Sequence, residues 1–228
     1  MAARSTDSDE LKGLETYGFI RGASGFIVGA VDQSVNNLED YGLLMEDIVL
    51  FATSLDLATC WLGGSFHKDN FSARINTQAH EIVPAVVSVG MGADRRNLVD
   101  RIIRNVAGSK KRLEWHHLFF DSDFKTPLTK ARAHHFAPVF DMVRLSPSAS
   151  NKQPWRLVLE GGSVHFLLQR THGYRRPMFS DLQRIDMGIA MSHFEAVCRE
   201  LNISGTWENF NIAATTPENW EYIVTWGG

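Results

Sequence analysis

The feature that most constrains the fold is an internal repeat. Two stretches of the chain align at a constant separation of 146 positions, and five residues are identical between them. The matched pairs are Asp40 with Asp186, Gly42 with Gly188, Met45 with Met191, Leu55 with Leu201, and Trp61 with Trp207. Both stretches are flanked by an apolar strand before the matched helix and by a Trp segment and a further strand after it. The repeat predicts two similar halves related by a pseudo-twofold axis within one chain.

In the first half, apolar runs predict strands at residues 25–31, 59–64 and 83–90, with Pro84 at the first residue of its strand or on a sheet edge. Asn36 or Asn37 begins a helix with apolar residues at helical spacing: Leu43, Leu44, Ile48, Phe51, Ala52 and Leu55. These positions are too rich in apolar side chains for a surface helix, so we expect a central one.

In the second half, the pattern predicts a helix over 129–145 and a hairpin over 157–168 that turns at Gly161-Gly162-Ser163. A second long helix is expected over 186–201, with Asp186 as its cap, followed by a terminal strand over 222–226. Residues of both long helices are expected in the core, among them Met45, Phe51, Met191 and Phe194.

Composition excludes several classes of protein. The chain has 228 residues and a formal net charge of −3, without the basic face of a nucleic-acid or membrane-surface protein. The first ten residues are polar and acidic, unlike a secretory signal, and no apolar run is long enough to span a bilayer. Cys60 and Cys198 have neither metal-type nor disulfide-framework spacing and are expected to be buried apolar residues. A cytoplasmic location is the resulting expectation.

Three short stretches carry candidate chemistry. Residues 146–155, Ser-Pro-Ser-Ala-Ser-Asn-Lys-Gln-Pro-Trp, form a polar loop that leads into an apolar strand. On spacing alone this loop is a helix-to-strand turn, or a polar cradle for a planar ligand. Gly63-Gly64 is equally an ordinary turn or a place of close backbone approach, and Lys110-Lys111-Arg112 is a solvated charge run or an anion site. The adjacent pairs His116-His117 and His134-His135 lack ligand spacing, so no metal site is predicted.

The loop at 144–155 resembles the Pro-Ser-x-x-Asn-x-Gln-Pro-Trp signature of the nitroreductase family of flavoproteins. Further matching stretches are 17–23, Cys60-Trp61-Leu62-Gly63-Gly64, 110–112, 185–191 and 218–222. The similarity is greatest to a branch in which one polypeptide contains both halves of the usual dimer. It implies an α+β nitroreductase-like fold with two halves, 1–125 and 126–228, that form an intramolecular pseudo-dimer.

The resemblance also implies a site between the halves for flavin mononucleotide (FMN). Carried over residue by residue, the ring contacts come from Ser146, Pro147, Ser148, Ala149 and Asn151, and from Gly63 and Gly64 on the other side, with the Gly64 backbone near flavin N5. Lys110 and Arg112 match the basic pair that holds the flavin phosphate. The departure Asp56-Leu57-Ala58, where the family has Gly-Leu-Gly, alters the packing behind the glycine pair.

The activity implied is FMN-dependent and needs no side-chain acid or base. NAD(P)H reduces the flavin, which then reduces a nitroaromatic, quinone or related electrophile in ping-pong fashion. The partners implied are small molecules, for a monomer that can associate further into a homodimer.

The alternative is a non-enzymatic, nitroreductase-like scaffold that binds flavin poorly or not at all. Residues 1–16 contain no match to the family's Arg-Ser-x-Arg helix, and Arg4-Ser5-Thr6-Asp7 lacks the second arginine. Compared with the second half, the first half looks short of one N-terminal element.

Overall fold

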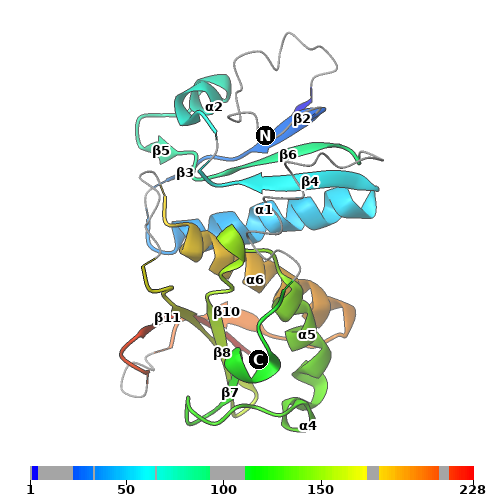
Figure 1. Ribbon diagram of the computed structural model, residues 1–228, viewed down its shortest axis with the longest axis vertical. Helices are drawn as coiled ribbons and strands as arrows, with labels where there is room; N and C mark the ends of the chain where they lie inside the picture. The colour runs from blue at the N-terminus through cyan, green and yellow to red at the C-terminus, as the bar shows by residue number, and fades with distance from the viewer. Residues whose placement is uncertain are drawn as a thin grey trace.

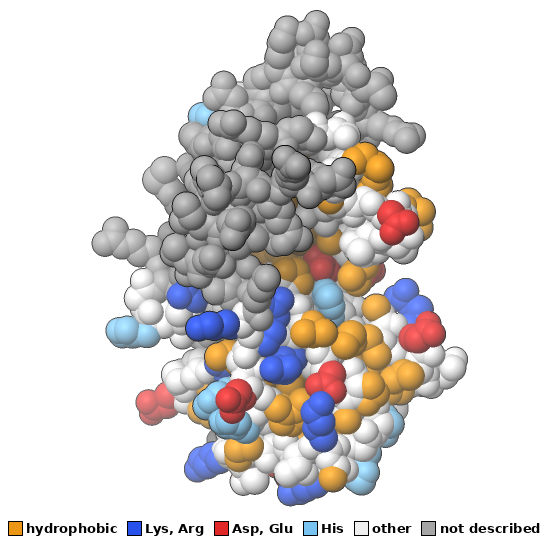
Figure 2. Space-filling view, turned by 45° about the vertical axis from the view of Figure 1, so that its right-hand side comes forward, with side chains coloured by type: hydrophobic (Ala, Val, Ile, Leu, Met, Phe, Trp, Pro, Cys, Tyr) orange, Lys and Arg blue, Asp and Glu red, His pale blue; other side chains and the backbone are white. Residues whose placement is uncertain are grey.

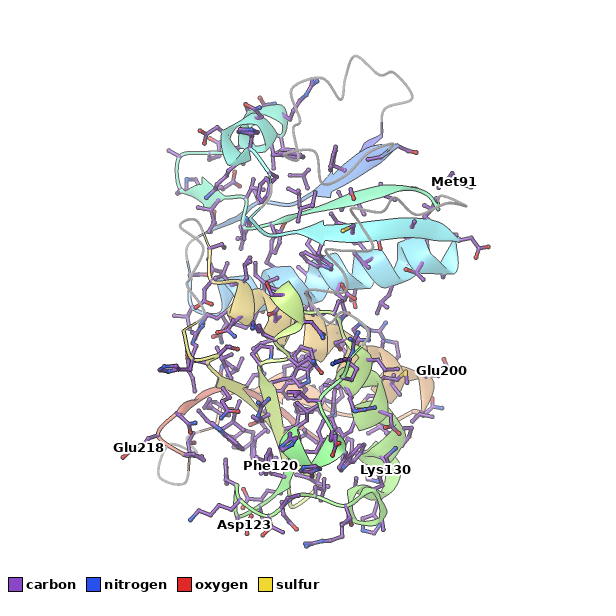
Figure 3. The ribbon with its side chains drawn as sticks, viewed as in Figure 1. Met91, Phe120, Asp123, Lys130, Glu200 and Glu218 are labelled. Carbon is purple, nitrogen blue, oxygen red and sulfur yellow. The ribbon has the colours of Figure 1, made fainter. Side chains whose placement is uncertain are left out.

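The computed structural model describes residues 2–4, 23–32, 34–64, 66–92, 111–173, 180–210 and 216–228. Seen in Figure 1, the fold is a stack of a β-sheet, two long helices and a second β-sheet. The helices are α1 (Asn37–Ser54) and α6 (Leu182–Glu200). They lie side by side and run in the same direction. Figure 3 shows that the C-terminal end of α6 (Glu200) and that of strand β6 (Met91) lie on the same side of the molecule.

The first sheet covers α1 and has the order β1-β2-β6-β4. Its strands are β1 (Ala2–Arg4), β2 (Gly25–Val28), β4 (Leu57–Leu62) and β6 (Val86–Met91), all paired antiparallel. A two-stranded ribbon of β3 (Val31–Asp32) and β5 (Glu81–Ile82) and the short helix α2 (Lys68–Arg74) complete this part. The predicted strands are confirmed, although the first one is divided between β2 and β3 and the third begins after Pro84.

The second sheet has the order β10-β11-β9-β8-β7. Its strands are β7 (Phe119–Asp121), β8 (Trp155–Glu160), β9 (Ser163–Gln169), β10 (Thr206–Glu208) and β11 (Trp220–Gly227). The hairpin of β8 and β9 turns at Gly161 and Gly162, whose positive φ values of 56° and 92° suit glycine. The parallel strand β7 lies N-terminal to residue 126 and yet pairs with β8 in this sheet.

The helix predicted over 129–145 is interrupted. It consists of α4 (Lys130–Ala133), the 3₁₀ turn η2 (His134–Phe136) and α5 (Ala137–Leu145). Thr129 caps α4 by accepting a hydrogen bond from the Arg132 N–H, and His134 has a positive φ of 49°. Pro138 lacks a backbone N–H, and it lies in the first turn of α5, where none is needed. The prediction of one continuous helix over 129–145 is therefore wrong, because a second helix, α5, starts at Ala137.

The two long helices are buried to different extents. Met45, Met191 and Phe194 are in the core as predicted, but Phe51 is 65% exposed. Leu44, Ile48 and Leu55 on the same face of α1 are exposed too, so the expectation that all these apolar residues are buried is wrong. The face of α1 formed by Tyr41, Met45, Val49 and Ala52 is buried, and this face alone accounts for the central position of the helix.

Helices α1 and α6 approach each other most closely at two glycines. A Cβ on Gly42 would lie 2.3 Å from the carbonyl oxygen of Ile185, and one on Gly188 would lie 2.0 Å from that of Glu39. No side chain fits at either position, so the backbones touch. A turn further on, the Ser192 hydroxyl donates to Asp47 over 2.6 Å, and His193 Nε2 lies 2.9 Å from Glu46 Oε1.

Candidate functional site

A cavity of about 410 Å³ lies where the N-terminal part of α6 meets the first sheet and the loop before β8. Its lining combines residues from both halves of the chain: Trp61, Gly63, Gly64, Ala85, Pro147, Ser148, Ala149, Ser150, Leu182, Ile185, Asp186 and Ile189. Five of the residues predicted for the site therefore lie on one cavity, namely Gly63, Gly64, Pro147, Ser148 and Ala149. The volume is in the range of small-molecule sites.

The first-half wall is built by the end of β4. Strand β4 ends at Leu62, and the chain passes directly into Gly63 and Gly64. A Cβ on Gly63 would lie 2.7 Å from the Leu182 side chain, whereas one on Gly64 would meet no atom of the described residues within 4 Å. Trp61 is fixed by its indole N–H, which donates to Glu46 Oε2 over 2.7 Å. This wall thus presents backbone and an anchored ring.

The opposite wall is the loop between α5 and β8, which includes the 3₁₀ turn η3 (Ala149–Asn151). Its backbone is unusual, because Ser150, Asn151 and Gln153 have positive φ values of 50°, 54° and 49°. The hydroxyl of Ser148 accepts the Gln153 N–H over 2.9 Å, and the buried Gln153 side chain accepts the Leu113 N–H over 2.8 Å. Such internal bonds hold a loop in a conformation that isolated residues disfavour.

Arg112 also supports this loop. Its guanidinium donates to Asn151 Oδ1 over 3.2 Å and to the Leu145 carbonyl oxygen over 3.0 Å, while Asn151 Nδ2 donates to the Lys111 carbonyl oxygen over 2.8 Å. Burial and the nearby Arg144 lower the pKa of Arg112. Arg112 and Asn151 therefore lie together, at the base of the loop rather than on the cavity wall.

Asp186 does not cap its helix. Helix α6 begins at Leu182 with Asp181 as N-cap residue, and Asp186 lies one turn inside it, 2% exposed. Its Oδ1 accepts the Ala149 N–H over 2.8 Å, which ties α6 to the loop. Burial raises the pKa of Asp186 well above its usual range; the Ala149 N–H opposes this shift and Asp181 adds to it. The prediction missed the role because a buried aspartate and a capping aspartate look alike in sequence.

The remaining predicted residues lie elsewhere. Ser146 is fully buried, and its hydroxyl has no hydrogen-bond partner within the described part of the chain. Lys110 lies outside the described residues. The apolar cavity residues Leu182, Ile185 and Ile189 were not predicted as site residues. Ile185 and Ile189 lie in the stretch 185–191 that resembles the family, and the only signal for Leu182 was its place in the apolar pattern of α6.

The described ranges contain no group of three or more His, Cys, Asp or Glu side chains placed to hold a metal ion. They also contain no helix with the length and apolar character required to cross a membrane.

Comparison with known proteins identifies the family. A family model described as "Putative TM nitroreductase" matches residues 3–198. The crystal structure of a putative nitroreductase from Thermotoga maritima is similar with a TM-score of 0.57 and 19% sequence identity, over 96% of this chain and 81% of that one. A search of curated proteins found no match. The structural similarity shows the mixed α/β fold, and the family match spans most of the sequence: the chain belongs to the putative TM nitroreductase family.

Proposed function

We propose that this chain is an FMN-dependent oxidoreductase whose flavin occupies the cavity between β4, α6 and the loop before β8. The observation that carries the proposal is the joint lining of the cavity by Gly63-Gly64 and by Pro147–Ser150. When bound, FMN would supply hydride chemistry at N5, with NAD(P)H as donor and a small-molecule electrophile such as a nitroaromatic or a quinone as acceptor.

The residues present fit a flavin ring. The cavity has apolar walls at Ala85, Leu182, Ile185 and Ile189 for a planar aromatic ligand, and polar groups of Ser148 and Ser150 lie on the loop side. At Gly64, where a Cβ would meet open space, the absence of a side chain leaves the backbone accessible to a ligand atom such as N5. We assign ring contacts to Pro147, Ser148, Ala149 and Gly63 as well, and support of the ring-binding loop to Ser146 and Asn151.

For the flavin phosphate we retain Lys110 and Arg112 as the proposed pair. Arg112 supplies positive charge for a dianion at the base of the loop that lines the cavity. Lys and Arg side chains gather near the middle of the face seen in Figure 2. Arg112 would then have a second role, since its guanidinium also holds Asn151 and Leu145.

We further propose that the chain is an intramolecular pseudo-dimer with halves 1–125 and 126–228, in which β7 of the first half adds to the sheet of the second by pairing with β8. The strand orders β4-β6-β2-β1 and β10-β11-β9-β8 correspond in chain order around the two long helices: in each half two of these strands precede the helix, and the strand that directly follows it lies at the sheet edge, next to the half's last strand. The helix contacts are reciprocal as well. The 146-residue offset relates the contact of Gly42 with Ile185 to that of Gly188 with Glu39. In the same way, it relates the Glu46–His193 contact to the Asp47–Ser192 contact. Reciprocal contacts of this kind are the mark of a twofold interface.

A second candidate is a scaffold that binds no flavin. It is favoured by the same Arg112 contacts, because a guanidinium that holds two loop oxygens has fewer donors to offer a phosphate. The two candidates differ in a single measurable property, the affinity of the purified protein for FMN.

FMN fluorescence quenching on titration with the protein measures that affinity, and NADH or NADPH oxidation with a quinone or nitroaromatic acceptor measures turnover. Gly64→Leu should weaken FMN binding tenfold or more at little cost in stability, since a Cβ at this position meets no atom of the described residues within 4 Å. Gly92→Leu is the matched control, because a Cβ on Gly92 would meet only the Ala58 Cβ, at 4.0 Å, among the described residues, and Gly92 does not line the cavity. FMN binding that survives Gly64→Leu unchanged would refute the placement of the flavin.

A further inference from the structure

Asp186 is the one ionisable residue among the twelve that line the cavity within the described part of the chain. One of its carboxyl oxygens, Oδ1, accepts the Ala149 N–H over 2.8 Å. The other, Oδ2, is buried and has no hydrogen-bond partner among the described residues. A buried polar atom without a partner is costly, and at a cavity wall it points to a ligand that supplies the partner.

The environment favours the neutral form of this carboxyl group. Burial is the main cause of the raised pKa of Asp186, and the nearby Asp181 acts in the same direction. The cationic Arg184 on the same helix is already paired, with Glu39 on α1 and with Glu221. The other acidic, basic and histidine side chains on the elements around Asp186 are Asp40, Glu46 and Asp47 on α1, Asp141 and Arg144 on α5, His193, Glu195, Arg199 and Glu200 further along α6, Lys152 after η3, and Arg112, which contacts Asn151. A neutral carboxyl group carries a proton and can donate it in a hydrogen bond.

The repeat supplies an internal comparison. Asp40 occupies the matching position on α1, 146 residues earlier, but it is exposed and lines no part of the cavity. Asp186 differs because the loop at 146–154 covers it. Its burial is therefore a consequence of the loop, not of its place in the helix repeat.

We propose that Asp186 is a positioning residue that links the loop to the flavin: Oδ1 holds the Ala149 N–H, and Oδ2 as a neutral O–H donates a hydrogen bond to a carbonyl or nitrogen acceptor of the flavin ring. The proposal rests on the proposed FMN site. It assigns the unpartnered Oδ2 a partner and explains why an acidic residue lies on an otherwise uncharged wall.

The test compares Asp186→Asn with Asp186→Ala, using Asp40→Asn as the matched control. The Asn amide reproduces the neutral acid, since its oxygen accepts and its NH₂ donates. We expect Asp186→Asn and Asp40→Asn to bind FMN within threefold of the wild type at pH 7. Asp186→Ala should bind roughly tenfold more weakly, the equivalent of one or two lost hydrogen bonds.

Hydrogen exchange of the Ala149 amide, followed by NMR in the FMN-free protein, provides a readout that needs no flavin. Protection of this amide should persist in Asp186→Asn and fall at least tenfold in Asp186→Ala. If Asp186→Asn binds FMN as weakly as Asp186→Ala, a charged carboxylate is required. If Asp186→Ala binds FMN as well as the wild type, the flavin ring takes no hydrogen bond from Asp186. Either result overturns the proposal.

Failure of the proposed function looks different from failure of this inference. If the wild type itself does not bind FMN, the proposed function and the contact between Asp186 and the flavin ring are both wrong. The exchange rates of the Ala149 amide still show in that case whether Asp186 holds the loop. If the wild type binds FMN and the three variants bind equally well, the inference alone is wrong.

Discussion

Helices α1 and α6 are matched by the repeat, yet α6 is buried over more of its surface than α1. Phe194 of α6 is fully buried among Phe136, Phe140 and Phe166, because α5 and η2 pack against it. The matching residue on α1 is Ile48, which is 42% exposed. The same comparison holds for Asp186 and Asp40. A repeat in sequence thus fixes how two helices meet each other, whereas the segments outside the repeat decide which positions become a core or a site.

The largest difference between the helices should appear on truncation of this matched pair. Phe194→Ala leaves a cavity in the aromatic cluster and should lower the free energy of unfolding by about 3–5 kcal/mol. Ile48→Ala removes a partly exposed side chain and should cost about 1 kcal/mol or less. Urea unfolding of both variants gives the two values. Equal losses would show that the exposed face of α1 is covered in solution.

The contact between the helices is tested by Gly188→Ala. The added Cβ would lie 2.0 Å from a backbone oxygen of α1, which cannot rotate away, so the helices must separate. We expect a loss of about 3 kcal/mol in unfolding free energy. Gly92→Ala is the control, since its Cβ would lie 4.0 Å from the nearest atom. A Gly188→Ala protein as stable as this control would contradict the close approach of α1 and α6.

The buried and exposed aspartates should differ in the pH dependence of stability. Because burial raises the pKa of Asp186 in the folded protein, folding takes up a proton there, and stability falls as the pH rises above the pKa of about 3.9 that an unfolded Asp has. Asp186→Asn removes this effect, so the variant should gain stability relative to the wild type between pH 4 and pH 7. Thermal unfolding across this range is the measurement. If the stability difference between Asp186→Asn and the wild type shrinks as the pH rises, Asp186 is charged in the folded protein.

A smaller effect is expected at the base of the loop. Arg112→Lys retains the charge but cannot donate to Asn151 and Leu145 with one planar group. We expect a loss of about 1 kcal/mol in unfolding free energy and several-fold weaker FMN binding. Lys130→Ala, which removes an exposed ion pair with Asp141, should change neither quantity measurably. FMN binding by Arg112→Lys at the wild-type level would leave the phosphate role of Arg112 without support.

Much of the fold could be predicted from local pattern. The strands, the glycine hairpin at Gly161-Gly162 and both long helices follow from apolar periodicity and turn residues. The break in the helix at His134 could not be predicted, because the apolar pattern continues across it. A proline inside a helical run either kinks a helix or starts a new one, and the sequence does not say which. The exposure of Phe51 was also unpredictable, since the spacing of apolar residues does not reveal whether another element covers them.

The candidate site was predictable where the residues carry a motif. Gly63, Gly64 and Pro147–Ala149 were selected by resemblance, and they line one cavity. The contacts that support the loop, from Arg112, Gln153 and Asp186, join segments about 40 residues apart. Pairing over such distances depends on tertiary packing, which a single sequence does not record.

The most direct test of the account is the number of FMN molecules bound per chain, measured from the visible absorption spectrum after adding FMN to the purified protein and desalting. The described residues contain one loop of the 146–154 type facing one glycine pair, so the account predicts one FMN per chain. A colourless protein would contradict the flavin site, and two FMN per chain would contradict the asymmetry between the halves.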